Sequence, residues 1–367
     1  MSLHLALLPG DGIGREVVPA ARRVLEALDR EVGLGLRTTT TEVGFDVFER
    51  TGAALPGETL ELVRGCDGAL LGAVSSPSHR VDGYRSPVVG LRRALDLGAC
   101  VRPLATPDDP TRLRLVVLRE NTEGLYAGRE RETRAAPSDD GSGGGGRVAI
   151  AERVVTESTC RRLARHAAAL ARRHGLGRVT VVHKANVLRT SCGLFREVVL
   201  DELAREAAEA AAGASHAPPL EVAEGLVDSV AARLAVDPDG FGVLVTTNLF
   251  GDILSDVAAV HAGGLGLVES LNVGPQHVVA EPVHGSAPDL AGTKRANPLA
   301  TIRAAGRLLE HLGRGEAAER VLRAAHAVAV HGPHTPDLGG DATTDQMTDA
   351  VVAQLCRTSQ PLEPAEA

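Results

Sequence analysis

Short runs of apolar residues alternate along this chain with longer segments rich in Ala, Arg and Glu. The short runs predict buried strands at residues 3–8, 68–74, 113–118, 179–183, 243–246 and 277–280. The longer segments predict helices at residues 15–32, 158–174, 196–212, 316–330 and 344–355. Strands and helices that alternate in this way predict an α/β fold, in which helices flank a parallel or mixed sheet.

A glycine-rich turn, LPGDGIG (8–14), joins the first predicted strand to the first helix. A Rossmann dinucleotide fingerprint requires the spacing Gly-x-Gly-x-x-Gly. Counted from Gly10 the third glycine position holds Arg15, and counted from Gly12 it holds Val17. The turn permits a close approach of the backbone, either to a ligand or only between strand and helix. The sequence therefore does not predict a Rossmann fold.

Two segments differ in composition from the rest of the chain. Residues 136–147 include the run SDDGSGGGG, which predicts a flexible Gly-rich loop. No Lys-Ser/Thr pair follows this run at the spacing of a phosphate-binding loop. Residues 359–367 are rich in Pro and Glu, and we expect a disordered tail.

Two aspartates follow the strand predicted at 243–246. The polar run TTN (246–248) offers caps for a new helix, and Asp252 and Asp256 then stand four residues apart on one face of it. Like charges so placed repel each other, which favours a cation between them, and a hard divalent ion is the simplest candidate. A solvated acidic helix face is the alternative that these two residues alone leave open.

Composition limits the classes of partner. The chain has 367 residues, enough for one large domain or two, and a formal net charge of −8. We expect no binding to nucleic acid, because no basic patch is present to contact phosphates. We expect no membrane partner, because no apolar run reaches the roughly 20 residues that a bilayer requires and no signal peptide is recognisable. Five scattered cysteines are typical of reduced thiols, and a cytoplasmic protein is expected.

Seven motifs occur in order along the chain. They are LLPGDGIG (7–14), GLRRALDLGACVRP (90–103), LRENTEGLYAG (118–128), VHKANVL (182–188), VTTNLFGDILSD (245–256), EPVHGSAPDLAG (281–292) and TPDLGGDATT (335–344). Together they resemble the β-decarboxylating hydroxyacid dehydrogenases, the isocitrate/isopropylmalate/homoisocitrate dehydrogenase family, and most of all homoisocitrate dehydrogenase. The resemblance implies an isopropylmalate-dehydrogenase-like two-domain fold. Residues 1–98 and 262–358 would form a large NAD-binding domain, and residues 99–261 a small domain for substrate and dimerisation.

The resemblance implies that three arginines, Arg92, Arg102 and Arg119, bind the carboxylates of a malate-like substrate. A guanidinium suits this task because its planar fork can bond both carboxylate oxygens. It also implies two proton-transfer residues. Tyr126 matches the acid that protonates the substrate carbon after CO2 is lost, and Lys184 matches the residue that moves a proton at the substrate 2-hydroxyl.

Further ligands are carried over from the same motifs. Asn186 matches a residue that contacts substrate or nicotinamide, and Asp228, Asp252 and Asp256 match three metal-binding aspartates. Such carboxylates suit Mg2+ or Mn2+. In this family the lysine and the first aspartate reach across from a partner subunit. The resemblance therefore implies a homodimer with shared active sites, or a higher oligomer, in which Lys184 and Asp228 serve the partner.

The cofactor is predicted from the motif EPVHGSAPDLAG. The residues that match the nucleotide-binding loop are His284, Gly285, Ser286 and Ala287. Asp289 occupies the position that selects the cofactor, where a carboxylate can accept hydrogen bonds from both ribose hydroxyls and repel a 2′-phosphate. Asn297 matches a residue that bonds the adenine. NAD+ is therefore the predicted cofactor.

The segment before Arg92 is expected to contact the substituent at C3 of the substrate. Ser86 matches the serine of isocitrate enzymes, whereas Val88 replaces their asparagine. Arg85 adds a guanidinium that favours an extra anionic group, provided that it does not point to solvent. The sequence thus predicts NAD-dependent oxidative decarboxylation of a 3-substituted malate, homoisocitrate or isocitrate-like, to a 2-oxo acid and CO2. The alternatives are 3-isopropylmalate and, in specialised biosynthesis, a phosphonate-bearing malate.

Overall fold

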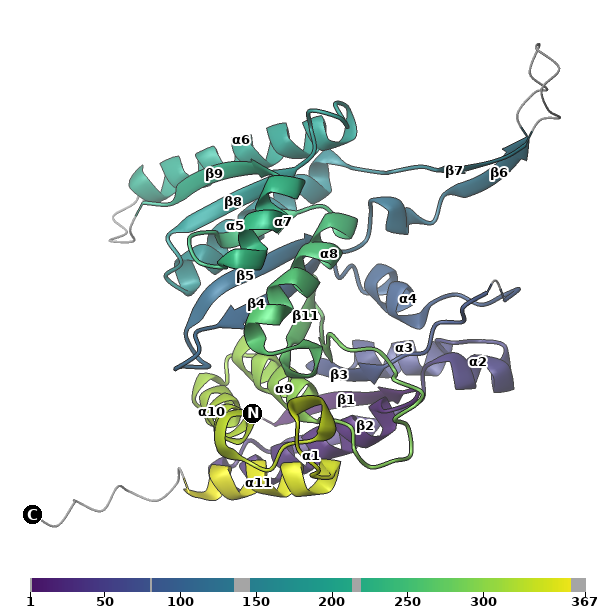
Figure 1. Cartoon of the computed structure of the whole chain (residues 1–367), viewed down its shortest axis with the longest axis vertical. Helices are drawn as coiled ribbons and strands as arrows, with labels where there is room; N and C mark the ends of the chain where they lie inside the picture. The colour runs from purple at the N-terminus through teal and green to yellow at the C-terminus, as the bar shows by residue number, and fades with distance from the viewer. Residues whose placement is uncertain (1, 80, 135–145, 213–218, 358–367) are drawn as a thin grey trace, which may run out of the picture. The chain divides into compact units, whose positions relative to one another are not determined.

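The structure is a computed structural model that describes residues 2–79, 81–134, 146–212 and 219–357 (Figure 1). The chain divides into two compact units, of which the first contains residues 1–116 and 256–367 and the second residues 117–255. The first unit is therefore built from both ends of the chain. The sequence also predicts one domain built from both ends of the chain and one continuous domain between them. It places the boundaries at 98/99 and 261/262, and these boundaries stay a prediction.

The first unit is a mixed sheet flanked by helices. Its strands lie in the order β2-β1-β3-β12-β11-β4, in which β2, β1, β3 and β12 are parallel and β11 is antiparallel to both neighbours. Its strands are β1 (Leu3–Gly10), β2 (Leu36–Thr40), β3 (Gly68–Ala73), β4 (Ala99–Ala105), β11 (Glu269–Val273) and β12 (Val278–Pro282). Its helices are α1 (Gly14–Val32), α2 (Phe45–Thr51), α3 (Gly57–Arg64), α4 (Pro87–Ala94), α9 (Leu299–His311), α10 (Gly315–His331) and α11 (Thr344–Arg357), with short 3₁₀ turns η2 (Val260–Ala262), η3 (Leu265–Leu267) and η4 (Pro336–Leu338).

Burial on both faces explains the continuous apolar sequence of β1. Ala6 and Leu8 pack on one face in a core with Val63 of α3 and Leu91 of α4. Residues one position away point to the opposite face, where α1 packs on β1 and β3, and they are buried as well. Helices therefore cover both sides of this sheet.

The glycine-rich turn after β1 joins three backbone segments. A Cβ on Gly10 would lie 1.9 Å from the carbonyl oxygen of Ala73, and one on Gly12 would lie 2.1 Å from that of Ser286. Between them the buried carboxylate of Asp11 accepts backbone N–H bonds from Phe45 at 2.7 Å and from Ser75 at 2.9 Å. The turn is a packed junction that only glycine can form at these positions.

The second unit is a smaller sheet with strands in the order β5-β10-β8-β9, in which β10 and β9 are both parallel to β8. The chain enters it through β5 (Leu113–Glu120) and leaves it through α8 (Asn248–Ala259). Its other strands are β6 (Glu130–Arg134), β7 (Arg147–Ala151), β8 (Arg178–His183), β9 (Glu221–Leu226) and β10 (Gly242–Thr246). Its other helical segments are α5 (Glu157–Arg173), α6 (Ser191–Ala212), α7 (Val227–Val236) and the 3₁₀ turn η1 (Leu125–Ala127).

β6 and β7 form a two-stranded antiparallel ribbon, apart from the main sheet of the second unit (Figure 1). Almost all of its residues are exposed. The predicted Gly-rich loop, 136–147, lies between the two strands and falls outside the described residues except for 146 and 147. The predicted tail, 359–367, also lies outside the described residues.

The predicted α/β fold, with helices flanking a parallel or mixed sheet, is confirmed. Every strand and helix expected in the opening pattern is present within a few residues of its predicted bounds. The elements that the pattern did not predict are β2, β4, β6, β7, β9, β11, α2, α3, α4, α7 and α9. None of the helices in the described part of the chain combines the length and apolarity that crossing a bilayer requires.

Candidate active site

Several predicted site residues of the second unit follow the carboxyl ends of the three parallel strands β8, β9 and β10. β8 ends at His183, directly before Lys184, and His183 pairs with Leu226, the last residue of β9. β10 ends at Thr246, and α8 begins two residues later. Because carboxyl ends of parallel strands meet at one edge of a sheet, Lys184, Asp228 and the start of α8 share that edge.

Arg119, near the end of β5, is the centre of one polar cluster in this unit. Its side chain is 2% exposed, and its Nε and Nη2 donate to Asn248 Oδ1 at 2.9 and 2.7 Å. Its Nη1 donates to the carboxylate of Asp252. Gly251 permits this approach, because a Cβ there would lie 2.6 Å from the Arg119 Cβ. The first turns of α8 are thus fixed against the guanidinium.

Tyr126 completes this cluster from the opposite side of Asp252. The Tyr126 hydroxyl donates to Asp252 Oδ2 at 2.5 Å, and the Arg119 guanidinium lies 5.0 Å from the centre of the tyrosine ring. Burial raises the pKa of Tyr126, and the hydrogen bond to Asp252 raises it further. The phenol therefore keeps its proton at neutral pH, as a proton donor must.

Lys184 and Asp228 form a separate ion pair, with 2.6 Å between Nζ and Oδ1. The side chain of Lys184 is 26% exposed and that of Asp228 is 62% exposed. The hydrogen bond from Lys184 is the main cause that lowers the pKa of Asp228. Asn186, in the turn after Lys184, is exposed. In the single chain the side chains of all three residues therefore reach the surface, where a second chain could contact them.

The predicted metal ligands are distributed over two elements. Asp252 and Asp256 lie one turn apart on α8, with 33% and 58% of their side chains exposed, and Asp256 accepts a hydrogen bond from Arg102 Nη1 at 3.3 Å. Within the described residues, no group of three His, Cys, Asp or Glu side chains is arranged to hold a metal. Two accessible carboxylates on adjacent turns nevertheless suit a hard divalent ion. The predicted trio stays a prediction, because it takes Asp228 from a partner subunit.

Arg92 has a different environment in the first unit. It lies near the end of α4 and is almost fully buried. Its Nη2 donates to Glu281 Oε1 at 3.0 Å and its Nε to Asn272 Oδ1 at 3.1 Å. Asn272 also donates to the same Glu281 oxygen, at 2.8 Å. The guanidinium is thus held by β11 and β12, through two residues that the sequence pattern did not identify.

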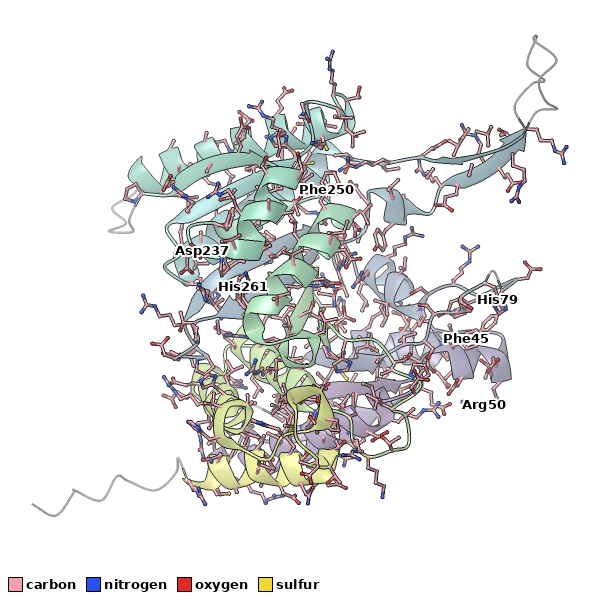
Figure 2. All side chains as sticks on the ribbon, in the orientation of Figure 1. Phe45, Arg50, His79, Asp237, Phe250 and His261 are labelled. Atoms are coloured by element: carbon pink, nitrogen blue, oxygen red, sulfur yellow. The ribbon has the colours of Figure 1, made fainter. Side chains whose placement is uncertain are left out.

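The segment before α4 is anchored by aromatic side chains. The ring of Tyr84 meets those of Phe45 and Phe48 edge-on, with 5.3 Å between ring centres in each pair. Phe45 is labelled in Figure 2. The Tyr84 hydroxyl donates to the carbonyl of Ser75 at 3.0 Å. The next residue, Arg85, is exposed, and Ser86 is the N-terminal cap residue of α4. The backbone that carries Arg85 is therefore fixed, whereas the side chain is accessible.

The predicted nucleotide loop packs against the glycine-rich turn of the same unit. The N–H of Ile13 donates to the carbonyl of Ser286 at 2.9 Å, and the hydroxyls of Ser286 and Ser75 lie 2.9 Å apart. Burial lowers the pKa of His284, which favours a neutral ring. Asp289 is exposed on the same loop. The glycine-rich turn therefore supports the predicted nucleotide loop through the hydrogen bond from Ile13 to Ser286.

Asn297 is buried and held at both ends of its carboxamide. Its Nδ2 donates to Asp337 Oδ2 at 2.9 Å, and its Oδ1 accepts the N–H of Leu299 at 2.9 Å. The other oxygen of Asp337 accepts the Thr335 hydroxyl at 2.6 Å. Asp337 thus links the motif at 335–344 to the predicted nucleotide site.

Comparison with known proteins places these features in one family. Residues 4–351 match the model of the isocitrate/isopropylmalate dehydrogenase family. The chain belongs to this family. It is 44% identical over 358 residues to an isocitrate/homoisocitrate dehydrogenase of Thermus thermophilus, with 97% of this chain and 99% of the relative covered. It is 42% identical over 359 residues to a 3-isopropylmalate/3-methylmalate dehydrogenase of Methanocaldococcus jannaschii, with 96% and 98% covered.

Solved structures agree with this assignment. The isocitrate dehydrogenase of Methylococcus capsulatus superposes with a TM-score of 0.83 at 38% identity, over 96% of this chain and 99% of that one. The family resemblance and the isopropylmalate-dehydrogenase-like fold predicted from the sequence are confirmed. As a member of the isocitrate/isopropylmalate dehydrogenase family, the chain is an oxidoreductase that acts as a decarboxylating dehydrogenase. The family generally uses NAD(P) and a divalent metal, and small molecules are its substrates.

Several structural partners in this isocitrate/isopropylmalate dehydrogenase family member were missed by sequence reasoning. Asn248 was identified only as a helix cap, yet its buried carboxamide orients Arg119. Glu281 and Asp337 lie within motifs used for the resemblance, yet no spacing rule relates them to Arg92 or Asn297. For Asn248 and Glu281 a polar residue next to an apolar run was the available signal, because buried polar groups need partners, whereas Asp337 lies in the polar run TPDLGGD and gave no such signal.

Proposed function

We propose that this enzyme oxidises and decarboxylates a 3-substituted malate that carries an extra anionic group, with NAD+ as oxidant and Mg2+ or Mn2+ as metal. Homoisocitrate or an isocitrate-like acid is the proposed substrate, and the products are a 2-oxo acid, CO2 and NADH. The observation that carries the proposal is the cluster in which Asp252 binds both the Arg119 guanidinium and the Tyr126 hydroxyl. In the proposed reaction this cluster would combine a carboxylate-binding cation, a metal ligand and a proton donor.

Arginine is the proposed anchor for the substrate carboxylates. Arg119 and Arg92 are held by Asn248 and by Asn272 and Glu281, so that their planar groups have fixed directions before a ligand arrives. A preformed guanidinium loses little side-chain entropy when it binds a carboxylate. Arg102 would contribute a third cation next to Asp256.

Two residues would move the protons of the reaction. Lys184 would take the proton of the 2-hydroxyl as NAD+ accepts hydride from the same carbon. After CO2 leaves, Tyr126 would donate its proton to C3, a step for which its hydroxyl is positioned by the hydrogen bond to Asp252. The two residues belong to separate clusters in one chain, which supports a site completed by Lys184 of a second chain.

Asp252 and Asp256 are proposed to hold Mg2+ or Mn2+ together with Asp228 of the partner. Their carboxylate oxygens and partial exposure fit this ion. When bound, the metal supplies Lewis-acid polarisation of the substrate 2-oxygen. A homodimer is further supported by apolar side chains of the second unit that lie in water in one chain, namely Val187, Val236 and Ile253, which are 66%, 83% and 53% exposed.

NAD+ is proposed over NADP+ because Asp289 presents an accessible carboxylate where a 2′-phosphate would approach. His284, Gly285, Ser286, Ala287 and Asn297 would surround the adenine nucleotide. The extra anionic group of the substrate is proposed from Arg85, whose exposed guanidinium follows a fixed aromatic anchor. Ser86 would contact the same substituent, and Asn186 the substrate or nicotinamide.

A direct assay tests the reaction. Purified enzyme with Mg2+ and NAD+ is offered homoisocitrate, isocitrate, 3-isopropylmalate and D-malate, and NADH formation is followed. A preference for one tricarboxylate that is abolished by EDTA and restored by Mn2+ is the expected result. A preference for 3-isopropylmalate would assign the alternative named above, and activity with none of the four would refute the proposed substrate class.

A further inference from the structure

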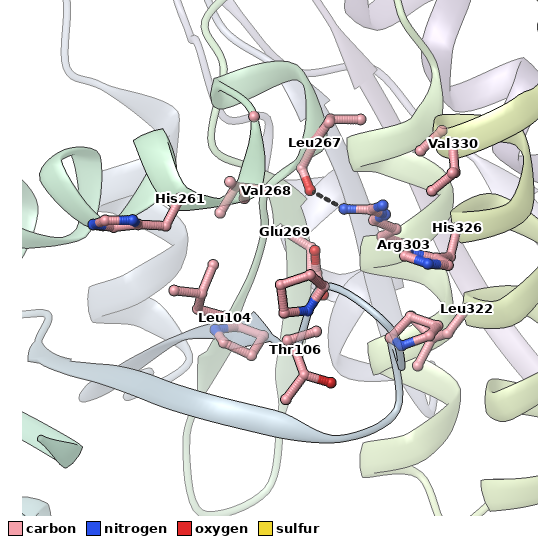
Figure 3. Close-up of a pocket in the computed structure, with 17 residues that line it drawn as sticks. Leu104, Thr106, His261, Leu267, Val268, Glu269, Arg303, Leu322, His326 and Val330 are labelled. Atoms are coloured by element: carbon pink, nitrogen blue, oxygen red, sulfur yellow. Dashed lines mark hydrogen bonds between the residues drawn. The ribbon is translucent and has the colours of Figure 1, made fainter. Parts of the chain in front are cut away.

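A pocket of about 310 Å3 lies in the first unit, and none of the residues that line it is a predicted substrate, metal or cofactor ligand (Figure 3). Its walls come from β4 and the turn after it, from η2, η3 and β11, and from α9 and α10. This volume is at the lower end for pockets that bind small molecules.

Apolar side chains line part of this pocket, and the polar side chains in its wall include Glu269, Arg303 and His326. Leu104, Leu322 and Val330 line it, and Arg303 extends from α9 so that its Nη1 donates to the carbonyl of Leu267 at 2.6 Å (Figure 3). A guanidinium has five N–H donors. Within the described residues, no carboxylate forms an ion pair with Arg303, and its Nε has no hydrogen-bond partner. The cation therefore keeps donors for a ligand.

The nearest acid, Glu269, offsets this charge only in part, because it raises the pKa of Arg303 by less than burial lowers it. Glu269, at the pocket wall, accepts from Nε of Arg307 at 3.0 Å, and both side chains are buried. Burial is the main cause that lowers the pKa of Arg303, and burial together with the Arg303 cation lowers the pKa of His326, whose ring lies beside it (Figure 3). A partly dry guanidinium without its own anion is unfavourable, and a bound anion relieves this.

We propose that this pocket binds a small aliphatic carboxylate, with the carboxylate on Arg303 and the hydrocarbon chain against Leu104, Leu322 and Val330. The apolar side chains favour an organic acid over an inorganic anion, because phosphate has no hydrocarbon to pack against Leu104, Leu322 and Val330 and would lose hydration there. The neutral His326 ring is compatible with either end of such a ligand. The site is additional to the proposed dehydrogenase site.

Isothermal calorimetry on the full-length enzyme, without substrate or NAD+, tests this inference independently of the proposed reaction. The probes are 3-methylbutanoate, its uncharged isostere 3-methylbutanamide, and inorganic phosphate. We expect the acid to bind at least about tenfold more tightly than the amide, since bonds to a charged group are the stronger ones. Phosphate is expected to bind no better than the amide.

Variants locate the binding. Arg303→Met is expected to weaken 3-methylbutanoate binding about ten- to a hundredfold, whereas Arg323→Met, on the exposed side of α10, leaves it unchanged. Val330→Glu places a repelling carboxylate at a half-exposed position of the rim and is expected to weaken binding without disturbing the core. Equal binding of acid and amide, preferred binding of phosphate, binding insensitive to both pocket variants, or no binding up to about 10 mM acid would each overturn the proposal.

Discussion

Two buried arginines, Arg119 in the second unit and Arg307 in the first, have similar burial but different partners. Their side chains are 2% and 3% exposed, and each donates hydrogen bonds from all three of its nitrogens. The carboxylate opposite Arg307, on Glu269, is 6% exposed, whereas the one opposite Arg119, on Asp252, is 33% exposed. Both partners of the Arg307 pair are buried, whereas Asp252 in the Arg119 pair keeps a third of its side chain exposed. We call the first pair closed and the second open.

This difference separates structural from functional charges. Both partners of the closed pair are buried, so the pair mainly connects the elements that carry it, here α9 and β11. In the open pair Asp252 also accepts the Tyr126 hydroxyl and keeps surface in contact with solvent. A partly exposed carboxylate beside a buried cation and a phenol is a candidate site for binding a charged ligand.

The largest effect is expected at the open pair. Asp252→Asn removes the charge that faces Arg119 and a proposed metal ligand, and kcat/KM should fall by about a thousandfold or more, which matches the several kcal/mol that a catalytic metal contributes. Steady-state kinetics with the preferred substrate measure it, with Mn2+ titrated in parallel. Ser255→Ala, a neighbour on α8, serves as control. A variant that keeps wild-type kcat/KM and metal affinity would exclude Asp252 from the site.

Substitution in the closed pair, Arg307–Glu269, should change the stability of the fold rather than kcat. Arg307→Met leaves Glu269 buried without its cation and should lower the free energy of unfolding by about 3–5 kcal/mol. Denaturant unfolding measures the loss, and kcat per folded enzyme should stay within about twofold, a change of under 0.5 kcal/mol. The double variant Arg307→Met/Glu269→Leu should recover most of the stability, since apolar replacement of a buried pair is tolerated. A loss of kcat at unchanged stability would contradict the distinction drawn above.

The role of distant partners also explains which strands and helices could be predicted from the sequence. Strands such as β1, with apolar residues throughout, and amphipathic helices such as α1 were predicted because their own residues determine burial. β11 was missed because Glu269 and Asn272 interrupt its apolar pattern, and these residues are buried only through Arg307 and Arg92, which are distant in sequence. Its identity as a strand depends on tertiary partners, which periodicity does not contain.

In the candidate site, too, some residues could be predicted from motifs and some of their supporting contacts could not. Asp252, Asp256 and Tyr126 were identified through motifs, and one chain brings Asp252 and Tyr126 together. The support of Arg119 by Asn248 was not predictable, because a helix-cap residue and a buried carboxamide that orients an arginine have the same sequence signature. Lys184 and Asp228 form their own pair in one chain. Which partner they meet in an assembly depends on a second chain.

Asp289 differs from both Asp252 and Glu269, because it is exposed and has no ion-pair partner within the described residues. Asp289→Asn keeps the shape but removes the repulsion toward a 2′-phosphate. The ratio of kcat/KM for NAD+ to that for NADP+ should fall about tenfold, the equivalent of roughly 1.4 kcal/mol. Kinetics with both cofactors measure it, and Asp341→Asn, another exposed aspartate of this unit, is the control. An unchanged ratio would assign cofactor choice to other residues.

Arg85 is the second exposed charge, and the expected effect depends on the substrate offered. If its guanidinium binds the extra anionic group, Arg85→Leu should lower kcat/KM for homoisocitrate by about tenfold, as loss of one charge-assisted hydrogen bond does. The same change should raise kcat/KM for 3-isopropylmalate, because an apolar substituent then meets an apolar side chain. Arg37→Leu, an exposed arginine on β2, controls for the loss of one surface charge. A solvent-facing Arg85 predicts equal, small changes for both substrates. A fall in kcat/KM for homoisocitrate together with a rise for 3-isopropylmalate would show that Arg85 gains its ionic partner only when the substrate binds. Asp252 already has Arg119 as a partner and remains partly exposed, so Arg85 would carry the same principle further.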